Sequence, residues 1–377
     1  MSVSVDESLR SWVEVDLDAL RHNAGVAAQK GGGRLMAIVK ANAYGHGVAQ
    51  VARALADQVA MFGVASLPEA EELRSSGVNT PVCLLGACLE AEYEQAIKDG
   101  FGITVNSLVQ ARKISTLASQ LGLLAHVHAV VDTGMGRLGF LESEWTAETI
   151  RELVSLPALY WEGMASHLPV ADEDADFTQM QIRRFAPMVN LAQQHGLSPA
   201  WVHLANSAGL LGFTEPQQFC NLTRPGLVLY GVSPLPDLQP LLRNTLTWKT
   251  RITLLRKLPA GQGVSYGRSV ILRRPTWVAT LACGYADGYP RQVSNTQVQV
   301  LIQGQRCPLL GRVTMDQIMV DVTDLQNPAQ LGDEVVLLGR QQQQEISAVE
   351  LAGYAGTIAW DIFTGIGRRV KRLYTAS

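Results

Sequence analysis

A lysine at the end of an apolar run is the most chemically suggestive residue of this sequence. Lys40 follows residues 35–39, whose side chains are typical of a fully buried strand. A buried ammonium group is costly unless it is paired or loses its proton. A desolvated lysine is an amine nucleophile near neutral pH, so the obvious task for Lys40 is a Schiff base. The structural alternative is a snorkelling stem or a salt-bridge partner.

The residues after the lysine add a hydroxyl group and two flexible positions. Tyr44 lies four residues after Lys40, and Gly45 and Gly47 let the backbone turn sharply. Together, residues 39–47 read VKANAYGHG and resemble the pyridoxal phosphate lysine motif of the alanine racemases. The resemblance implies that Lys40 and Tyr44 bind this cofactor.

Composition narrows the class of function. The 377 residues allow about two domains, and a net charge of -3 without a basic block argues against nucleic acid or a membrane surface as partner. No stretch approaches the about 20 apolar residues of a spanning helix, and no secretory signal is recognisable. The five cysteines form no CxxC pair. We expect a cytoplasmic protein that acts on a small molecule.

The pattern from residue 11 to about residue 240 predicts alternating strands and helices. We expect strands at 35–39, 61–65, 82–85, 102–105, 127–131, 160–165, 201–204 and 219–223. Helical patterns separate them at 47–57, 68–75, 89–98, 107–121, 142–154 and 178–195. An α/β fold follows, either an open doubly wound sheet or a (β/α)8 barrel. The barrel is favoured, because its mouth would gather residues that follow strands, namely Lys40, Arg137, His167, Asn206, Ser207 and Arg224.

The glycine-rich loop after the fifth strand has two interpretations. Gly134, Gly136 and Gly139 match the spacing of a dinucleotide-binding loop, but that loop should open a first βα unit. Residues 132–137, DTGMGR, instead resemble an alanine racemase motif. The resemblance implies that Arg137 binds the phenolic oxygen of the cofactor and the substrate carboxylate, a task that suits a charged, bidentate donor.

Histidines end or line two of the strands. His167 follows the sixth strand; it could be structural, but the resemblance puts it against the cofactor ring, between Arg224 and a catalytic tyrosine. His126 and His128 share one face of the fifth strand. Without a third ligand nearby in sequence, we expect structural burial and no metal.

A phosphate site is predicted where the barrel closes. Barrels often bind phosphate after strands seven and eight, with backbone amides at a helix start. Asn206 and Ser207 follow strand seven, and Gly226 and Leu227 follow strand eight; with Tyr44 they form a plausible cradle.

The resemblance makes a specific prediction for Arg224: its side chain should contact the pyridine nitrogen of the cofactor. Most pyridoxal enzymes have a carboxylate there, which keeps that nitrogen protonated. An arginine can only donate, so the nitrogen stays unprotonated. Transamination should then be suppressed and proton exchange at Cα retained.

Residues 241–377 read as a separate, mostly β domain, with 1–240 forming the barrel domain. Racemisation needs bases on both faces of Cα. Three motifs match the family at 261–267, 284–289 and 311–317, and the resemblance makes Tyr266 the second base, with its pKa of about 10 lowered by nearby positive charge. This tyrosine would come from the partner of a homodimer with shared active sites. The substrate-binding Met315 would come with it, as would the gate residues Tyr285, Arg291 and Arg312. Asp172 and Asp316 are expected at the entrance or next to the residues that contact the ligands.

Two positions depart from the family pattern. Val130 stands where many members carry a carbamylated lysine behind the DTGMGR arginine, so Arg137 must be oriented otherwise. A phosphate-binding tyrosine of some members aligns near residues 367–369, where Arg368 could replace it. Either change could alter the substrate.

The sequence as a whole predicts a pyridoxal phosphate-dependent racemase that interconverts L-alanine and D-alanine and supplies D-alanine for peptidoglycan. Serine, or a broader range of amino acids, is the nearest alternative substrate. A decarboxylase on the same scaffold is disfavoured by Arg224, and a non-catalytic cofactor carrier by the second domain that holds Tyr266.

Overall fold

The computed structural model describes residues 6 and 8–375. They form two compact units. The first, the barrel unit, comprises Leu20–Ala43 and Val48–Arg243. The second, the β unit, comprises the described residues up to Ala19 together with Tyr44–Gly47 and those from Asn244 onward.

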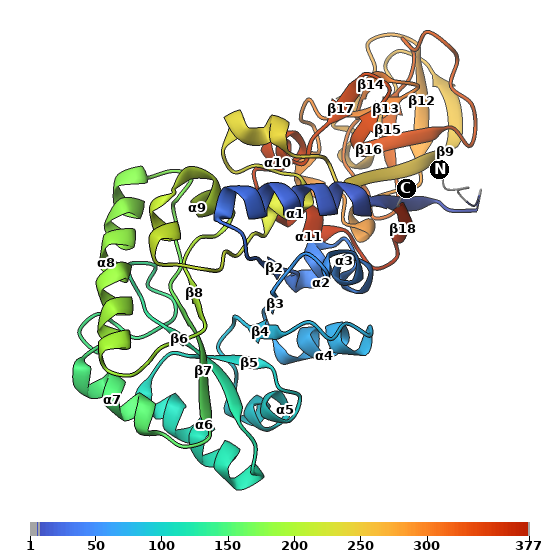
Figure 1. The fold of residues 1–377 in the computed structure, drawn as a ribbon. Helices are drawn as coiled ribbons and strands as arrows, with labels where there is room; N and C mark the ends of the chain where they lie inside the picture. The colour runs from blue at the N-terminus through green and yellow to red at the C-terminus, as the bar shows by residue number, and fades with distance from the viewer. Residues whose placement is uncertain (1–5, 7, 376–377) are drawn as a thin grey trace. The chain divides into compact units, whose positions relative to one another are not determined.

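The barrel unit is built on a parallel sheet whose strands pair in chain order, β2 to β8 (Figure 1). Strands β2, β3 and β5 are buried along their whole length, as expected of strands covered on both faces. The seven strands are β2 (Met36–Ile38), β3 (Met61–Val64), β4 (Val82–Leu84), β5 (Gly102–Val105), β6 (Ala125–Val130), β7 (Leu159–Ala165) and β8 (Trp201–His203).

The expected eighth strand exists only as single bridges. Leu222 bridges to His203 in β8, and Thr223 bridges to Leu35 just before β2, both in parallel. This segment is too short and interrupted for a regular ladder, because the Asn221 side chain accepts the Val202 amide and Pro225 lacks an N–H. The segment nevertheless joins β8 to β2, so the predicted barrel class is confirmed.

Helices surround the sheet, and most match the predicted segments (Figure 1). The side chains of Ser107, Thr146 and Asp174 cap the starts of three of these helices, so the helix expected at 142–154 begins only after Thr146. The helices are α1 (Leu17–Gly31), α2 (Lys40–Tyr44), α3 (Val48–Leu55), α4 (Leu67–Ser75), α5 (Tyr93–Lys98), α6 (Leu108–Leu121), α7 (Ala147–Ser155), α8 (Ala175–Gln194) and α9 (Ser207–Gly212). Sequence analysis missed α1. In the described part of the chain, no helix is long and apolar enough to span a bilayer.

The β unit contains a nine-stranded sheet and a separate ribbon of β10 (Gly263–Val264) and β11 (Val270–Ile271). The long strand β9 (Leu246–Leu258) pairs with β1, β12 and β16. The other strands are β1 (Ser11–Asp16), β12 (Thr276–Leu281), β13 (Gln299–Ile302), β14 (Gln305–Pro308), β15 (Ile318–Asp321), β16 (Glu334–Gln341), β17 (Gln344–Ile346) and β18 (Lys371–Thr375). Two helices, α10 (Ala348–Ala355) and α11 (Ala359–Gly365), accompany them.

The amino-terminal strand corrects the predicted domain limits. Sequence analysis placed residues 1–240 in the barrel domain, but β1 pairs antiparallel with β9 and parallel with β18. Trp12 and Trp248 are both fully buried there. The backbone hydrogen bonds and buried aromatic area of β1 therefore belong to the β unit.

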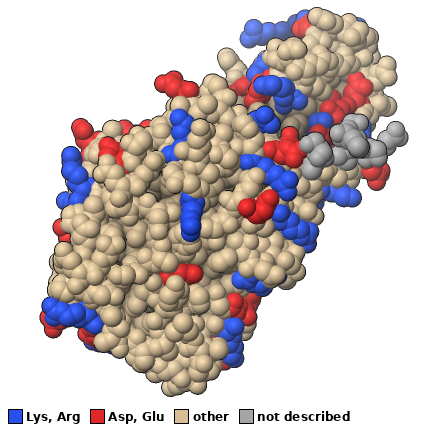
Figure 2. Space-filling model, in the orientation of Figure 1, with Lys and Arg blue, Asp and Glu red and all other residues tan. Residues whose placement is uncertain are grey.

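Charged side chains of both signs are intermixed on the face shown in Figure 2. No single-sign block gathers on that face.

Candidate functional site

Lys40 begins a left-handed turn at the end of β2. Ala41, Asn42 and Ala43 have φ of 52°, 54° and 51°, and Tyr44 has φ of 50°. A left-handed conformation costs roughly 1–2 kcal/mol for each residue that is not glycine, so other contacts must hold this turn. Strained backbone of this kind is typical of functional sites.

Three hydrogen bonds hold this turn. The Ala43 amide donates to Val39 O at 2.8 Å, and the Val48 amide donates to Asn42 Oδ1 at 2.8 Å. The third comes from the Ala41 amide, which donates to Glu69 Oε1 at 2.7 Å. The second oxygen of this glutamate accepts the amide of Ala65 after β3, also at 2.7 Å.

Glu69 is therefore a clamp between the ends of two strands, and sequence reasoning missed it. The signal was present, since Ser66 precedes α4 and Glu69 stands three residues later, the spacing of a capping box. The carboxylate uses this position to hold the lysine turn instead of the helix start.

The Lys40 side chain is exposed, which corrects the expectation of a buried lysine: the strand is buried, and the lysine stands at its open end. Its pKa is nevertheless lowered, first by the loss of surrounding water and then by the charge of Arg137, while Glu69 opposes the shift. Lys40 thus yields a neutral amine at lower pH than an ordinary lysine.

The glycine-rich loop binds its own carboxylate. Asp132 Oδ1 accepts the amides of Gly134 and Met135, and Oδ2 accepts the amide of Gly136, each at 2.8 Å. These amides would be the donors of a dinucleotide phosphate loop, so their use by Asp132 argues against that interpretation. The loop ends with Arg137 exposed.

Arg224 is the centre of a group of hydrogen-bonded residues in the barrel unit. It is 5% exposed, and burial lowers its pKa to about 10, which leaves it cationic at neutral pH. Its Nη1 donates to His203 Nδ1 at 2.5 Å and to His203 O at 2.9 Å. Its Nη2 donates to Ser166 O at 2.6 Å, Leu204 O at 3.0 Å and His167 Nδ1 at 3.1 Å.

This contact fixes the state of His167. An arginine can only donate, so His167 Nδ1 is an acceptor and Nε2 carries the proton. Burial, Arg224, Arg137 and Lys40 lower the pKa of His167 to about 3. His167 is therefore a neutral imidazole that offers one N–H.

The expected phosphate cradle is assembled in part. Ser207 Oγ accepts the amide of Gly226 at 2.9 Å and that of Val228 at 3.3 Å, which puts its hydroxyl at the start of the short 3₁₀ turn Leu227–Tyr230. Asn206 has a structural task, because it caps α9 through Gly209 and donates to Leu168 O. Tyr44 belongs to the β unit. Burial raises the pKa of its hydroxyl group to about 12, so the hydroxyl stays protonated.

The β unit exposes the second set of predicted residues. Tyr266 is 70% exposed, Met315 53% and Tyr285 40%. Ser265 Oγ donates to Arg312 O at 2.6 Å, so the loop of Tyr266 is tied to that of Arg312. The amides of Tyr285 and Ala286 donate to Thr314 O and Met315 O at 3.0 and 2.9 Å, which joins the motifs at 284–289 and 311–317.

An arginine that sequence analysis missed locks these two motifs further. Arg369 pairs with Asp287 at 2.7 Å and with Asp316 at 2.7 Å. Asp287 also accepts the Gly284 amide. The remaining predicted residues lie in both units. Arg368, next to Arg369, is exposed in the β unit, and Arg291 begins a 3₁₀ turn of that unit. Asp172 is exposed in the barrel unit.

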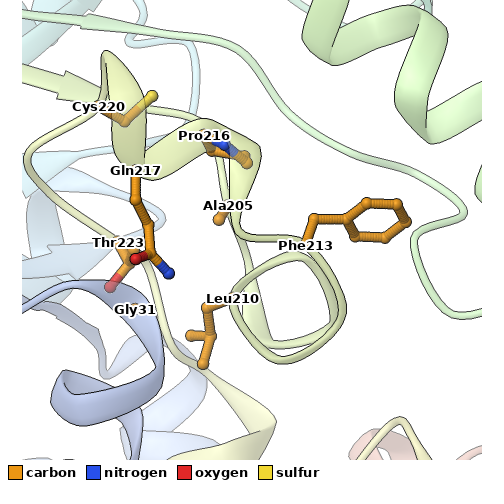
Figure 3. A pocket seen from close by; sticks show the side chains of 8 residues that line it. All are labelled: Gly31, Ala205, Leu210, Phe213, Pro216, Gln217, Cys220 and Thr223. Atoms are coloured by element: carbon orange, nitrogen blue, oxygen red, sulfur yellow. The ribbon is translucent and has the colours of Figure 1, made fainter.

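A small pocket is lined by none of the predicted site residues (Figure 3). It is lined by Gly31 at the end of α1, by Leu210 of α9 and by residues between 205 and 223. Burial raises the pKa of the Cys220 thiol in this lining to about 12. A thiol in that state is a poor nucleophile. We therefore assign no chemistry to this pocket. Among the described residues, no group of three or more histidine, cysteine or carboxylate side chains is arranged to hold a metal.

Two family models match most of this chain. Residues 15–234 match the family model "Alanine racemase, N-terminal domain" and residues 245–374 match "Alanine racemase, C-terminal domain". The chain belongs to the alanine racemase family. The family resemblance and the amino-acid racemase class expected from the sequence are confirmed.

Individual relatives cover nearly the whole chain. An alanine racemase of Symbiobacterium thermophilum is 42% identical over 377 residues, 99% of each chain. The crystal structure of alanine racemase from Streptomyces lavendulae has a TM-score of 0.91, with 34% identity over 98% of each chain. That of Bartonella henselae, with covalently bound pyridoxal phosphate, has a TM-score of 0.87 and 29% identity over 97% of this chain and 99% of the other.

Replacing Glu69 tests the clamp on the lysine turn. In Glu69→Ala the amides of Ala41 and Ala65 lose their acceptor, and we expect the free energy of unfolding to fall by about 1 kcal/mol. Urea denaturation measures the change, and Glu71→Ala, on the same helix and exposed, is the control. Equal stability of the two variants would show that the hydrogen bonds of Glu69 do not stabilise the lysine turn.

Arg137→Met tests the electrostatics of Lys40. Removing the positive charge should raise the Lys40 pKa, so that its labelling by an amine reagent begins at higher pH than in the unmodified protein. Mass spectrometry of the Lys40 peptide across pH gives the midpoint. Arg112→Met, at an exposed arginine paired with Glu152, should leave the midpoint unchanged. An unshifted midpoint in Arg137→Met would contradict the assignment.

Proposed function

We propose that this protein is a pyridoxal phosphate-dependent alanine racemase that interconverts L-alanine and D-alanine. The observation that carries the proposal is the buried Arg224, whose terminal nitrogens are held by five acceptors, one of them the neutral His167. The covalently bound pyridoxal phosphate of the Bartonella henselae relative supports the choice of cofactor.

The residues of the barrel unit fit this cofactor. Nη1 and Nη2 of Arg224 carry four N–H groups, and the acceptors around them engage all four, so the Nε–H is the donor for the pyridine nitrogen. Lys40 offers an amine of lowered pKa for the covalent bond. Ser207, Gly226 and Leu227 offer a hydroxyl group and a 3₁₀ start for the phosphate, and we also assign Tyr44 and Asn206 to phosphate binding.

The cofactor, when bound, supplies an electron-withdrawing ring that makes the Cα proton of an amino acid acidic. The protein must then remove this proton on one face and return one on the other. We assign the D-alanine face to Lys40 and the L-alanine face to Tyr266 of a second copy of the chain. The 70% exposure of Tyr266 suits a residue that serves a partner.

The remaining residues bind and admit the substrate. Arg137 is the donor for its carboxylate, and Met315 of the second copy lines the site. Asp172, Tyr285, Arg291, Arg312 and Asp316 form the entrance. Val130 offers no charge to orient Arg137, and Arg368 is a candidate phosphate or substrate ligand. We further propose a cytoplasmic homodimer whose D-alanine is used for peptidoglycan.

Arg224 also separates this proposal from a decarboxylase. A decarboxylase of the same scaffold should use a carboxylate at the pyridine nitrogen, whereas Arg224 is a cation that can only donate. Serine stays the alternative substrate, because one added hydroxyl group is poorly rejected by a small pocket.

Circular dichroism of L-alanine with the purified protein and pyridoxal phosphate tests the activity. We expect the signal to decay to zero, and faster than that of L-serine. Faster decay of serine would move the assignment to a serine racemase. No decay with either, despite bound cofactor, would contradict the proposal, and Lys40→Ala should abolish the decay.

Deuterium exchange tests the assignment of the two faces. In Tyr266→Phe, racemisation should fall by about 10²–10⁴-fold, because one acid–base group is lost. Deuterium from the solvent should still enter D-alanine through Lys40, but not L-alanine. Tyr160→Phe, at a 42% exposed tyrosine of the barrel unit, is the control. Equal loss of exchange from both enantiomers would contradict the assignment.

A further inference from the structure

A row of hydrogen bonds runs from the buried Arg224 to a partly buried carboxylate. Arg224 Nη1 contacts His203 Nδ1 at 2.5 Å, His203 Nε2 contacts His128 Nδ1 at 3.0 Å, and His128 Nε2 contacts Glu162 Oε2 at 3.2 Å. Both imidazoles are fully buried, on β8 and β6, and Glu162 stands on β7. Of these four side chains, only Arg224 belongs to the site proposed above.

The arginine fixes the direction of every bond in this row. Because Arg224 can only donate, His203 Nδ1 must accept, so the His203 proton lies on Nε2. That N–H donates to His128 Nδ1, which leaves the His128 proton on Nε2, where it faces Glu162. Each imidazole dipole thus points from the buried cation toward the carboxylate.

Two other observations bear on the protonation of this row. Burial, Arg224 and His128 lower the pKa of His203 well below its ordinary value, which agrees with a neutral ring. Burial opposes a raised pKa of His128, whereas Cys83 and Glu162 favour one. A cationic His128 would require His203 to accept at both nitrogens, which a neutral imidazole cannot do. The hydrogen-bond geometry therefore selects a neutral His128.

Two glycines make room for the row. A Cβ at Gly163 would lie 2.0 Å from His128 Nδ1, so any side chain there would displace the ring. A Cβ at Gly102 would lie 3.3 Å from the same ring and 3.4 Å from Glu162 Oε2. Neither glycine has a positive φ, so the backbone does not require them. Their absence of a side chain serves the packing of His128 and Glu162.

We propose that Glu162 is a positioning residue that acts through His128 and His203 to hold the guanidinium of Arg224 in one orientation. The carboxylate terminates the row with an acceptor and provides the negative end toward which both rings are polarised. The consequence for the ring nitrogen of the cofactor rests on the proposed function, whereas the polarity of the row does not.

Nitrogen NMR of the histidine rings tests the polarity directly. In protein labelled with ¹⁵N-histidine, we expect His128 and His203 to be neutral with the proton on Nε2. His46 is an internal reference of the opposite form, because its Nδ1 lies 2.9 Å from the carbonyl oxygen of Tyr44 and must carry the proton. A cationic His128, or a proton on Nδ1 of either ring, would overturn the proposal whether or not the protein is a racemase.

Gly163→Ala and Gly25→Ala form a matched pair for the kinetic test. The first inserts a methyl group against His128 without changing any member of the row, and the second adds one where nothing lies within 4 Å. We expect kcat for alanine to fall by about 10–100-fold in Gly163→Ala, as for other residues that orient a ligand indirectly, with little change in KM. Gly25→Ala should match the unmodified enzyme.

Variants of Glu162 separate its role from bulk packing. Glu162→Gln still offers an oxygen to His128 and should keep kcat. Glu162→Leu removes the acceptor of the His128 Nε2–H and should lower kcat, while both tautomers, which Arg224 fixes, stay unchanged. His126→Gln alters the other histidine beside Glu162, at 3.6 Å, and should change neither kcat nor the tautomers. Unaltered kcat in Glu162→Leu would overturn the proposal. An unmodified protein with the expected tautomers but no racemase activity would overturn only the proposed function.

Discussion

The chemistry of the barrel depends on one buried cation that can only donate hydrogen bonds. Arg224 comes from the segment that closes the barrel, and its terminal nitrogens contact the ends of strands β7 and β8 through Ser166, His167 and His203. Its burial would be unfavourable without these acceptors. The same contacts determine which nitrogen of each histidine carries a proton. The contacts that allow Arg224 to be buried therefore also determine the protonation of the histidines around it.

Carboxylates that accept backbone amides hold the loops around the predicted residues. Glu69 binds the left-handed turn after Lys40, and Asp132 binds the loop that leads to Arg137. In the β unit, Asp287 binds the amide of Gly284 and pairs with Arg369. Each loop is thus fixed by a short side chain of its own unit, which suits side chains that must stay in register with a small ligand.

The limits of sequence reasoning follow from the range of the interactions. Eight barrel strands were predicted from short, mostly apolar runs, and seven of them form. The eighth, expected at 219–223, forms only single bridges, because composition does not reveal where a ladder is interrupted. Strand β1 was assigned to the barrel because no local pattern reveals that Trp12 pairs with Lys249. The motifs predicted roles for Lys40, Arg137, His167 and Arg224. The row that ends at Glu162 escaped notice because its members come from separate strands.

The central claim is that Arg224 keeps the pyridine nitrogen of the cofactor unprotonated, and nitrogen NMR measures this most directly. The protein would be loaded with pyridoxal phosphate carrying ¹⁵N in the ring. The account predicts the chemical shift of a neutral pyridine that accepts a hydrogen bond, unchanged across neutral pH. A pyridinium shift would contradict it, because an arginine at this position could not then be the donor.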